Sequence, residues 1–191
     1  HYAEVAQASG LNPLRMLLDA GLNPHVLDEP DLMIPGDKVG RLLQDSASQS
    51  GNESFGLCMA SSRLLSNLGP VGLLIRDQQT LRDSLNLLVR YLATLNSALS
   101  LVIEETGDTV VLRKRLLSGR AGEPTRQRVE LAMGVMVRVI RQLIGRDWQP
   151  QRVYFEHAAP RDGRMHTQMF GSRVVFNQEF SGIVCTKADL D

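Results

Sequence analysis

The stretch from Leu68 to Leu117 decides the expected fold. It reads LGPVGLLIRDQQTLRDSLNLLVRYLATLNSALSLVIEETGDTVVLRKRLL. Leucines recur in it at alternating spacings of four and three residues, which places them on one face of a helix. They are Leu81, Leu85, Leu88, Leu92 and Leu95. Thr80 is expected to cap this helix, because its hydroxyl can accept a hydrogen bond from the N–H of Asp83.

The apolar period changes to two at Asn96–Ser97, which indicates that a strand follows the helix. Leu99, Leu101 and Ile103 alternate with polar residues, residues 106–108 have the composition of a tight turn, and residues 109–116 alternate again. We therefore expect a hairpin whose apolar face is covered by the helix, with the rest of the chain packed on this core.

Short helices are expected before this stretch. Residues 2–22 suggest two of them, joined around Asn12 as an N-cap and Pro13 as the first helical position. Residues 35–50 and 55–63 predict two more, with Gly51 and Ser54 at the boundary. The first pair is expected to bury Leu11, Leu14, Leu17 and Leu18. It resembles a helix-turn-helix only superficially, because residues 13–20 carry one arginine among mostly apolar side chains.

A second long helix is predicted from Pro124 or Thr125 to Ile144, with Gly145 as its stop. Two apolar rows run along it, which is more than one packing face requires. One row is Val129, Ala132, Met136, Ile140 and Leu143, and the other is Leu131, Val135 and Val139. The helix is therefore either buried between the sheet and the N-terminal helices or part of a subunit interface.

Strands are expected at residues 152–157, 174–176 and 182–186, with a short helix at 161–170. The fold class is α+β: a helical N-terminal third followed by an antiparallel or mixed sheet packed with two long helices. We expect a single domain over residues 1–191, with a helical part at 1–67 and an α/β part at 68–191.

Composition and charge restrict the partners. The 191 residues include 21 Lys plus Arg and 21 Asp plus Glu, so the formal net charge is zero. Such a balance argues against a surface built for nucleic-acid backbones or anionic lipid. The chain has no apolar run long enough to span a membrane and nothing like a signal peptide, so a cytoplasmic location is expected.

No motif points to catalysis, a metal or a cofactor, and none is expected. The chain has no HExxH or CxxC pattern, no P-loop and no nucleophile elbow. Cys58 and Cys185 lie in apolar runs, where a thiol is a small core residue rather than a nucleophile. His157, beside Glu156, is expected to be a hydrogen-bonded structural histidine. A small enzyme that uses a cysteine or histidine remains an open alternative.

Several stretches, in order along the whole chain, resemble the N-terminal domain of the "arabinose-binding" branch of AraC/XylS-type bacterial transcription regulators. The motifs that carry the resemblance are GLNP at 10–13, DLMIP at 31–35, GNESFGL at 51–57, LGPVG at 68–72, TL at 80–81, RY at 90–91, VYFEH at 153–157, FG at 170–171 and the closing Leu190-Asp191. Family members usually have a tyrosine where this chain has His166.

The resemblance implies an effector-sensing and dimerising domain that controls a C-terminal helix-turn-helix domain absent from this chain. It implies a homodimer, a small-molecule effector such as an amino acid, a fatty acid or another carboxylate, and DNA contact only through the absent domain. A module that dimerises without a ligand is the other alternative. The candidate dimer residues are those of the second apolar row, Leu131, Val135 and Val139.

We expect the effector in a mostly apolar pocket between the helix after Thr80, the sheet and the N-terminal helices. Its candidate lining consists of aromatic residues, one histidine and two arginines that could pair with a carboxylate. They are Phe55, Arg76, Arg90, Tyr91, Phe155, His157, Phe170 and Phe176.

Overall fold

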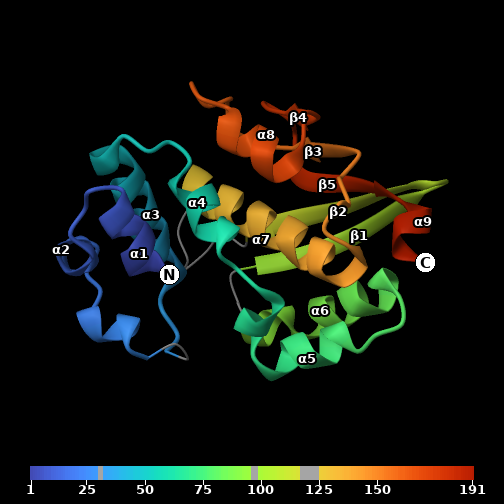
Figure 1. The fold of residues 1–191 in the computed structure, drawn as a ribbon, viewed down its shortest axis with the longest axis horizontal. Coiled ribbons are helices and arrows are strands. Elements are labelled where there is room, and N and C mark those ends of the chain that lie inside the picture. The colour runs from blue at the N-terminus through green and yellow to red at the C-terminus, as the bar shows by residue number, and fades with distance from the viewer. Residues whose placement is uncertain (30–31, 96–98, 117–124) are drawn as a thin grey trace.

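A computed structural model describes residues 1–29, 32–95, 99–116 and 125–191, apart from the side chains of Arg115 and Leu116. Three of the expected features fall wholly or partly outside these ranges: the change of period at Asn96–Ser97, part of the DLMIP motif, and the opening of the second long helix before Thr125. The described chain is α+β, as predicted, with helices on one side of a mixed sheet (Figure 1).

The N-terminal part is helical and has its own small core. It comprises α1 (Tyr2–Ala8), α2 (Pro13–Asp19), the 3-10 helix η1 (Pro24–Leu27), α3 (Gly36–Ser50), α4 (Phe55–Ser61) and η2 (Leu65–Leu68). Asn12 caps α2 as predicted, by accepting a hydrogen bond from the N–H of Arg15 at 3.1 Å. Leu17 is buried in this core, but Leu14 and Leu18 are 51% and 61% exposed, so their predicted burial was wrong. The seven-residue α2 buries only one face, and these two leucines lie on the other.

The central stretch has the predicted form. After α5 (Pro70–Arg76), α6 runs over Leu81–Leu95 and leads to β1 (Leu99–Thr106) and β2 (Thr109–Leu116). Thr80 Oγ1 accepts a hydrogen bond from Asp83 N at 3.1 Å, which confirms the cap. Four leucines of the predicted row are buried and Leu95 is partly buried.

Arg82, on the outer face of α6, is less exposed than its position in the pattern suggests. Its guanidinium pairs with Glu105 of β1 and donates to Asp191 Oδ1 at 2.7 Å. The side chain therefore ties α6 to the hairpin and to the last residue described.

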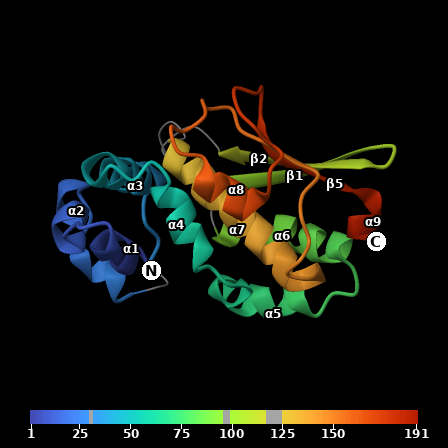
Figure 2. The same ribbon diagram turned by 45° about the horizontal axis from the view of Figure 1, so that its top comes forward.

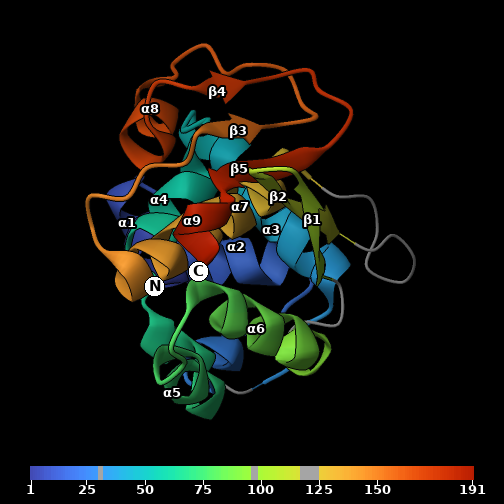
Figure 3. The same ribbon diagram turned by 90° about the vertical axis from the view of Figure 1, so that its right-hand side faces the viewer.

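The sheet combines segments that are far apart in the sequence. Its order is β1-β2-β5-β3-β4, with β3 at Arg152–Tyr154, β4 at Val174–Val175 and β5 at Ser181–Thr186 (Figure 3). All neighbouring pairs are antiparallel except β3 and β4. β3 ends three residues earlier than predicted, because the N–H of Glu156 bonds to the side chain of Ser181 instead of the backbone of β5.

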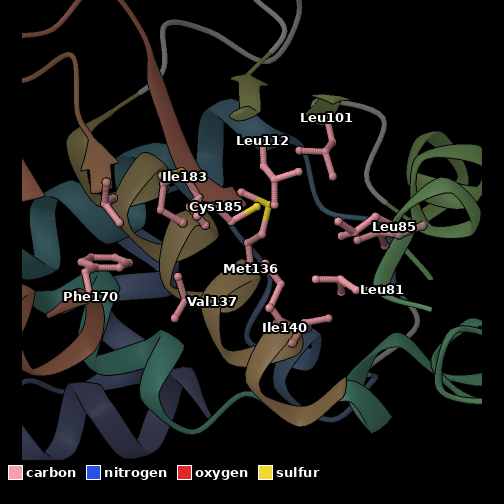
Figure 4. Close-up of a cluster of buried hydrophobic side chains, with 14 of the residues drawn as sticks. Leu81, Leu85, Leu101, Leu112, Met136, Val137, Ile140, Phe170, Ile183 and Cys185 are labelled. Atoms are coloured by element: carbon pink, nitrogen blue, oxygen red, sulfur yellow. The ribbon is translucent and has the colours of Figure 1, made fainter. Parts of the chain in front are cut away.

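The helix α7 (Arg126–Ile144) lies between the sheet on one side and α4 and α8 (Arg164–Phe170) on the other (Figure 2). This confirms the first of the two predicted placements for its wide apolar surface. Met136 and Ile140 point toward the sheet and α6, where Leu81, Leu85 and Leu112 complete the core (Figure 4). The short α9 (Lys187–Leu190) follows β5 directly and closes the described chain.

Two glycines allow α4 to approach α7 very closely. A Cβ added at Gly56 would lie 2.3 Å from the backbone oxygen of Gln127, and one added at Gly134 would lie 2.6 Å from Cβ of Ala60. Ser54 precedes α4 as predicted but makes no capping hydrogen bond with its side chain. Instead the side chain of Gln127 accepts from Gly56 N at 2.8 Å, so α7 supplies the cap.

Candidate functional site

A buried carboxylate on α7 organises the first candidate site. Glu130 has no exposed surface. Its Oε1 accepts hydrogen bonds from Arg126 Nε at 2.8 Å and lies 2.9 Å from His166 Nε2 of α8, while His157 Nε2 is 3.6 Å away. A carboxylate can be buried when charged or hydrogen-bonding groups surround it, so these residues make its burial possible.

Aromatic rings enclose this cluster. Phe155 stacks on Phe176 with ring centroids 5.6 Å apart, and its ring also lies 4.8 Å from His157 and 5.5 Å from Phe170. The ring of His166 meets that of Phe176 edge to face at 5.3 Å. Four of the eight predicted ligand residues, all from the C-terminal quarter of the chain, therefore lie together around Glu130.

Three polar atoms in this cluster are buried without a hydrogen-bond partner among the described residues: Glu130 Oε2, His166 Nδ1 and His157 Nε2. Burial lowers the pKa of His157 below its usual value, against the opposing effects of its hydrogen bond to the Ala158 carbonyl and of the Glu130 charge. The imidazole of His157 is consequently held toward its neutral form.

An open cleft adjoins the cluster through Arg126. Its volume is about 820 Å³, and it lies between the end of α3, the start of α4, the first turn of α7 and α8. Arg126 lines it, and one of its terminal nitrogens donates to Glu53 O at 3.1 Å. Arg161 and Arg164 also line it, and Arg164 is paired with Asp162 at 2.6 Å. A molecule in this cleft would contact the same guanidinium that binds Glu130.

A second group of buried charges lies on the sheet side of α7. Lys114 of β2 is 6% exposed and Arg128 of α7 is 7% exposed. Burial first, and the charge of Arg128 second, lower the pKa of Lys114 to about 7. Lys114 Nζ has no hydrogen-bond partner within the described ranges.

Comparison with known proteins assigns the family. The family described as "Arabinose-binding domain of AraC transcription regulator, N-term" matches residues 10–191. The chain belongs to this family. As an arabinose-binding-type domain it is the sensing part of a transcription regulator, which confirms the resemblance seen in the motifs.

The relatives of this AraC-type domain include the HTH-type transcriptional regulator VirS of Mycobacterium tuberculosis, in strains CDC 1551 / Oshkosh and H37Rv. Each is 28% identical over 182 residues, covering 95% of this chain and 54% of the relative. The chain thus spans about half the length of the curated relatives it matches.

A solved structure shares the fold of this AraC-type domain. The transcriptional regulator CdpR from Pseudomonas aeruginosa matches with a TM-score of 0.65 at 18% identity, over 94% of this chain and 55% of that protein. At this identity the likeness concerns the fold alone.

The structure separates the other four predicted ligand residues from the Glu130 cluster. Phe55 lies in the N-terminal core of the AraC-type domain, with its ring 6.1 Å from that of Tyr2. Arg76 is exposed and paired with Asp77 at 3.1 Å. Arg90 is exposed and Tyr91 half-buried on α6. These residues therefore do not share one pocket with Phe155, and the side chains that line the cleft include none of the eight.

The predicted dimer residues are already partly used inside this AraC-type chain. Val139 is buried in the main core, whereas Leu131 and Val135 are partly buried and pack against it. Of the three, only Leu131 and Val135 retain side-chain surface that a second subunit could cover.

Three functional candidates of this AraC-type domain were missed from the sequence: Arg126, Glu130 and Lys114. A carboxylate between Val129 and Leu131 in a predicted apolar helix was an available indication of a buried charge. The spacing of Lys114 was another such indication. It follows Leu112 by two residues and Val110 by four, so in a strand all three side chains lie on the same face.

Neither the thiols nor a metal adds a site among the described residues. Burial raises the pKa of Cys185 to about 12, so its nucleophilic thiolate is disfavoured at neutral pH. Cys58 is partly buried and lies 3.6 Å from Asn52 Nδ2. Over the ranges the structure describes, no three His, Cys, Asp or Glu side chains are placed to hold a metal ion. No helix there is both long and apolar enough to cross a bilayer.

Proposed function

We propose that the chain is the effector-sensing and dimerisation domain of an AraC-type transcription regulator, located in the cytoplasm. It binds a small molecule without turning it over. It controls DNA binding by a helix-turn-helix domain that these residues do not include. The family match over residues 10–191 supports the sensing role.

The observation that carries the effector proposal is the set of unpartnered buried polar atoms on both faces of α7. Glu130 Oε2 belongs to the carboxylate that meets His166 of α8, and Lys114 Nζ belongs to the sheet that packs on α7. A buried polar group without a partner costs about 1–3 kcal/mol, so a finished core rarely keeps several. A ligand that supplies hydrogen bonds beside α7 would remove part of this cost. Phe155, His157, Phe170 and Phe176 are the proposed apolar and aromatic wall on the α8 side.

A thermal-unfolding screen of amino acids, fatty acids and small carboxylates against residues 1–191 tests the proposal. A ligand at a hundredfold its dissociation constant should stabilise the domain by about 2.7 kcal/mol. If neutral, cationic and anionic compounds all leave the melting temperature unchanged at millimolar concentration, the effector role is refuted.

The dimer is tested separately. Regulators of this type contact paired half-sites on DNA, and a two-fold interface uses the same patch on both subunits, so one substitution acts twice. We expect Val135→Asp to give a folded monomer and Met136→Asp, in the core, to unfold the chain. Sedimentation equilibrium with circular dichroism reads both outcomes. Wild-type protein that stays monomeric at high concentration refutes dimerisation by this domain.

A further inference from the structure

Lys114 occupies a position that the sheet pattern reserves for apolar side chains. Val110 and Leu112 precede it on the same face of β2, and both are fully buried against α6 and α7. Its cross-strand neighbours on that face are Leu101 of β1 and Ser181 of β5, which are also buried. The amine is therefore at the edge of the core rather than in solvent.

Neither cross-strand neighbour neutralises this amine. Leu101 is apolar, and the hydroxyl of Ser181 is already engaged, since it donates to Glu156 Oε2 at 2.9 Å and accepts from Glu156 N at 3.2 Å. Lys114 Nζ has no partner anywhere in the described part of the chain. A buried ammonium without a partner is strongly unfavourable, and lysines are rarely found in such positions.

The charge of Arg128 makes the environment of Lys114 more positive. Arg128 projects from the first turns of α7, and its charge lowers the pKa of Lys114 further. Asp37 at the start of α3 acts on Arg128. The same helix brings Gly40 so close that an added Cβ would lie 2.9 Å from Cδ of Arg128. Lys114 of the sheet and Arg128 of α7, which α3 approaches through Gly40, are thus two buried basic side chains. Figures 1 and 3 show where the sheet, α7 and α3 lie in the fold.

We propose that Lys114 anchors the carboxylate of an organic acid at the inner face of β2, with Arg128 as the second positive charge. This inference rests on the proposed function and names the class of effector. Leu101 and Leu112 are buried neighbours of Lys114 on the same face of the sheet, so the ligand is a monocarboxylate with an apolar body rather than a phosphate or a polyacid. Arg76 and Arg90, the partners that the sequence predicted for such a carboxylate, are exposed and have no part in this site.

This assignment has a thermodynamic consequence that a surface lysine would not show. In the free protein at pH 8, Lys114 is largely unprotonated, because its pKa is about 7. A carboxylate beside the amine stabilises the ammonium form, so binding takes up a proton from solution. Binding at an exposed arginine or lysine takes up none, because those groups are already protonated.

The test uses sodium hexanoate and octanoate as probes, with hexanamide, octanamide and sodium chloride at matched concentrations as controls. In the 191-residue chain, the carboxylates should raise the melting temperature and the amides should not. Lys114→Met should weaken octanoate binding at least tenfold. Arg76→Ala, which removes an exposed cation, should leave it unchanged. Lys114→Gln provides a second variant should Met disturb the packing.

Calorimetry at pH 8 in two buffers of different ionisation enthalpy should show net proton uptake by the wild type and none by Lys114→Met. The inference is overturned if octanoate stabilises the Lys114 variants as much as the wild type. It is also overturned if no carboxylate stabilises the wild type more than chloride does. In either case a neutral or cationic compound that raises the melting temperature keeps the sensing function, whereas a screen without any active compound refutes both.

Discussion

The two faces of α7 bury charge in opposite ways. Toward α8, Glu130 has Arg126 and His166 within 2.9 Å, and aromatic rings seal the group. Toward the sheet, Lys114 and Arg128 place like charges near each other, and the lysine has no hydrogen-bond partner within the described ranges. A paired buried charge is compatible with a completed fold, whereas an unpaired one marks a candidate ligand site.

The largest expected effect comes from breaking the paired face. Glu130→Ala removes the acceptor for Arg126 and His166 and should destabilise the chain by about 3–5 kcal/mol in urea unfolding at pH 7. Glu130→Gln, which keeps the shape, should cost less. Glu179→Ala on the exposed surface is the matched control and should change stability by under about 0.5 kcal/mol. A loss from Glu130→Ala as small as the control's would mean that the cluster does not hold the fold together.

Alanine substitutions at two glycines test how tightly neighbouring helices pack against the two faces of α7. Gly56→Ala places a Cβ against a backbone oxygen of α7 that cannot move independently, and should cost about 1–3 kcal/mol. Gly40→Ala meets Cδ of the Arg128 side chain, which can shift more readily than a backbone oxygen, and gains helix propensity of about 1 kcal/mol, so it should cost less. Urea unfolding of both variants measures the difference, and equal losses would contradict it.

The unpaired face should become more stable when its charge is removed. Lys114→Met should stabilise the ligand-free chain by about 1 kcal/mol or more at pH 6, because the ammonium no longer has to be buried. The folded pKa of about 7 lies below that of an unfolded lysine, so the wild type gains stability as the pH rises from 7 toward 10. Arg128, whose charge acts on Lys114, and Asp37, whose charge acts on Arg128, stay unchanged in the variant.

The advantage of Lys114→Met should therefore shrink between pH 7 and pH 10. Thermal unfolding at pH 6, 8 and 10 measures it. An advantage that does not change with pH would show that the lysine is not buried as an ammonium, and the contrast between the two faces of α7 would disappear.

The smallest effect is expected at His157, which lies at the margin of the paired face. Burial lowers its pKa, so the unfolded chain binds the proton more readily and the wild type loses stability as the pH falls through about 6.5. Among the groups around the ring, the Ala158 carbonyl and Glu130 raise the pKa of His157, whereas Arg126 and His166 lower it. His157→Phe should reduce the difference in unfolding free energy between pH 7 and pH 5 by under about 1 kcal/mol. An unchanged difference, with exposed His25→Gln as control, would show that His157 titrates as it does in the unfolded chain.

The sequence could predict what local pattern determines. The row of leucines, the Thr80 cap and the turn before Thr109 fix α6 and the hairpin, because each depends on residues close in sequence. The strand order could not be predicted, since β5 pairs with β2 across about seventy residues and no local pattern encodes that choice. The exposure of Leu14 and Leu18 could not be predicted either, because the sequence of a leucine-rich helix does not show how much of its surface the neighbouring elements will cover.

The candidate site was predicted where its residues come from one segment. Phe155, His157, Phe170 and Phe176 share the C-terminal quarter of the chain, and the structure brings them together. Phe55, Arg76, Arg90 and Tyr91 belong to other helices and lie elsewhere. Glu130 and Lys114 derive their character from burial, which residue type alone does not reveal.

The position of β5 has a consequence for how the chain can fold during synthesis. The last strand in the sequence is the middle strand of the sheet, between β2 and β3. Until Thr186 has left the ribosome, the hairpin of β1 and β2 presents an unpaired edge, and β3 and β4 form a ladder of only two residue pairs. The sheet therefore closes only after β5 has been synthesised, and until then the open edge of β2 can pair with other chains.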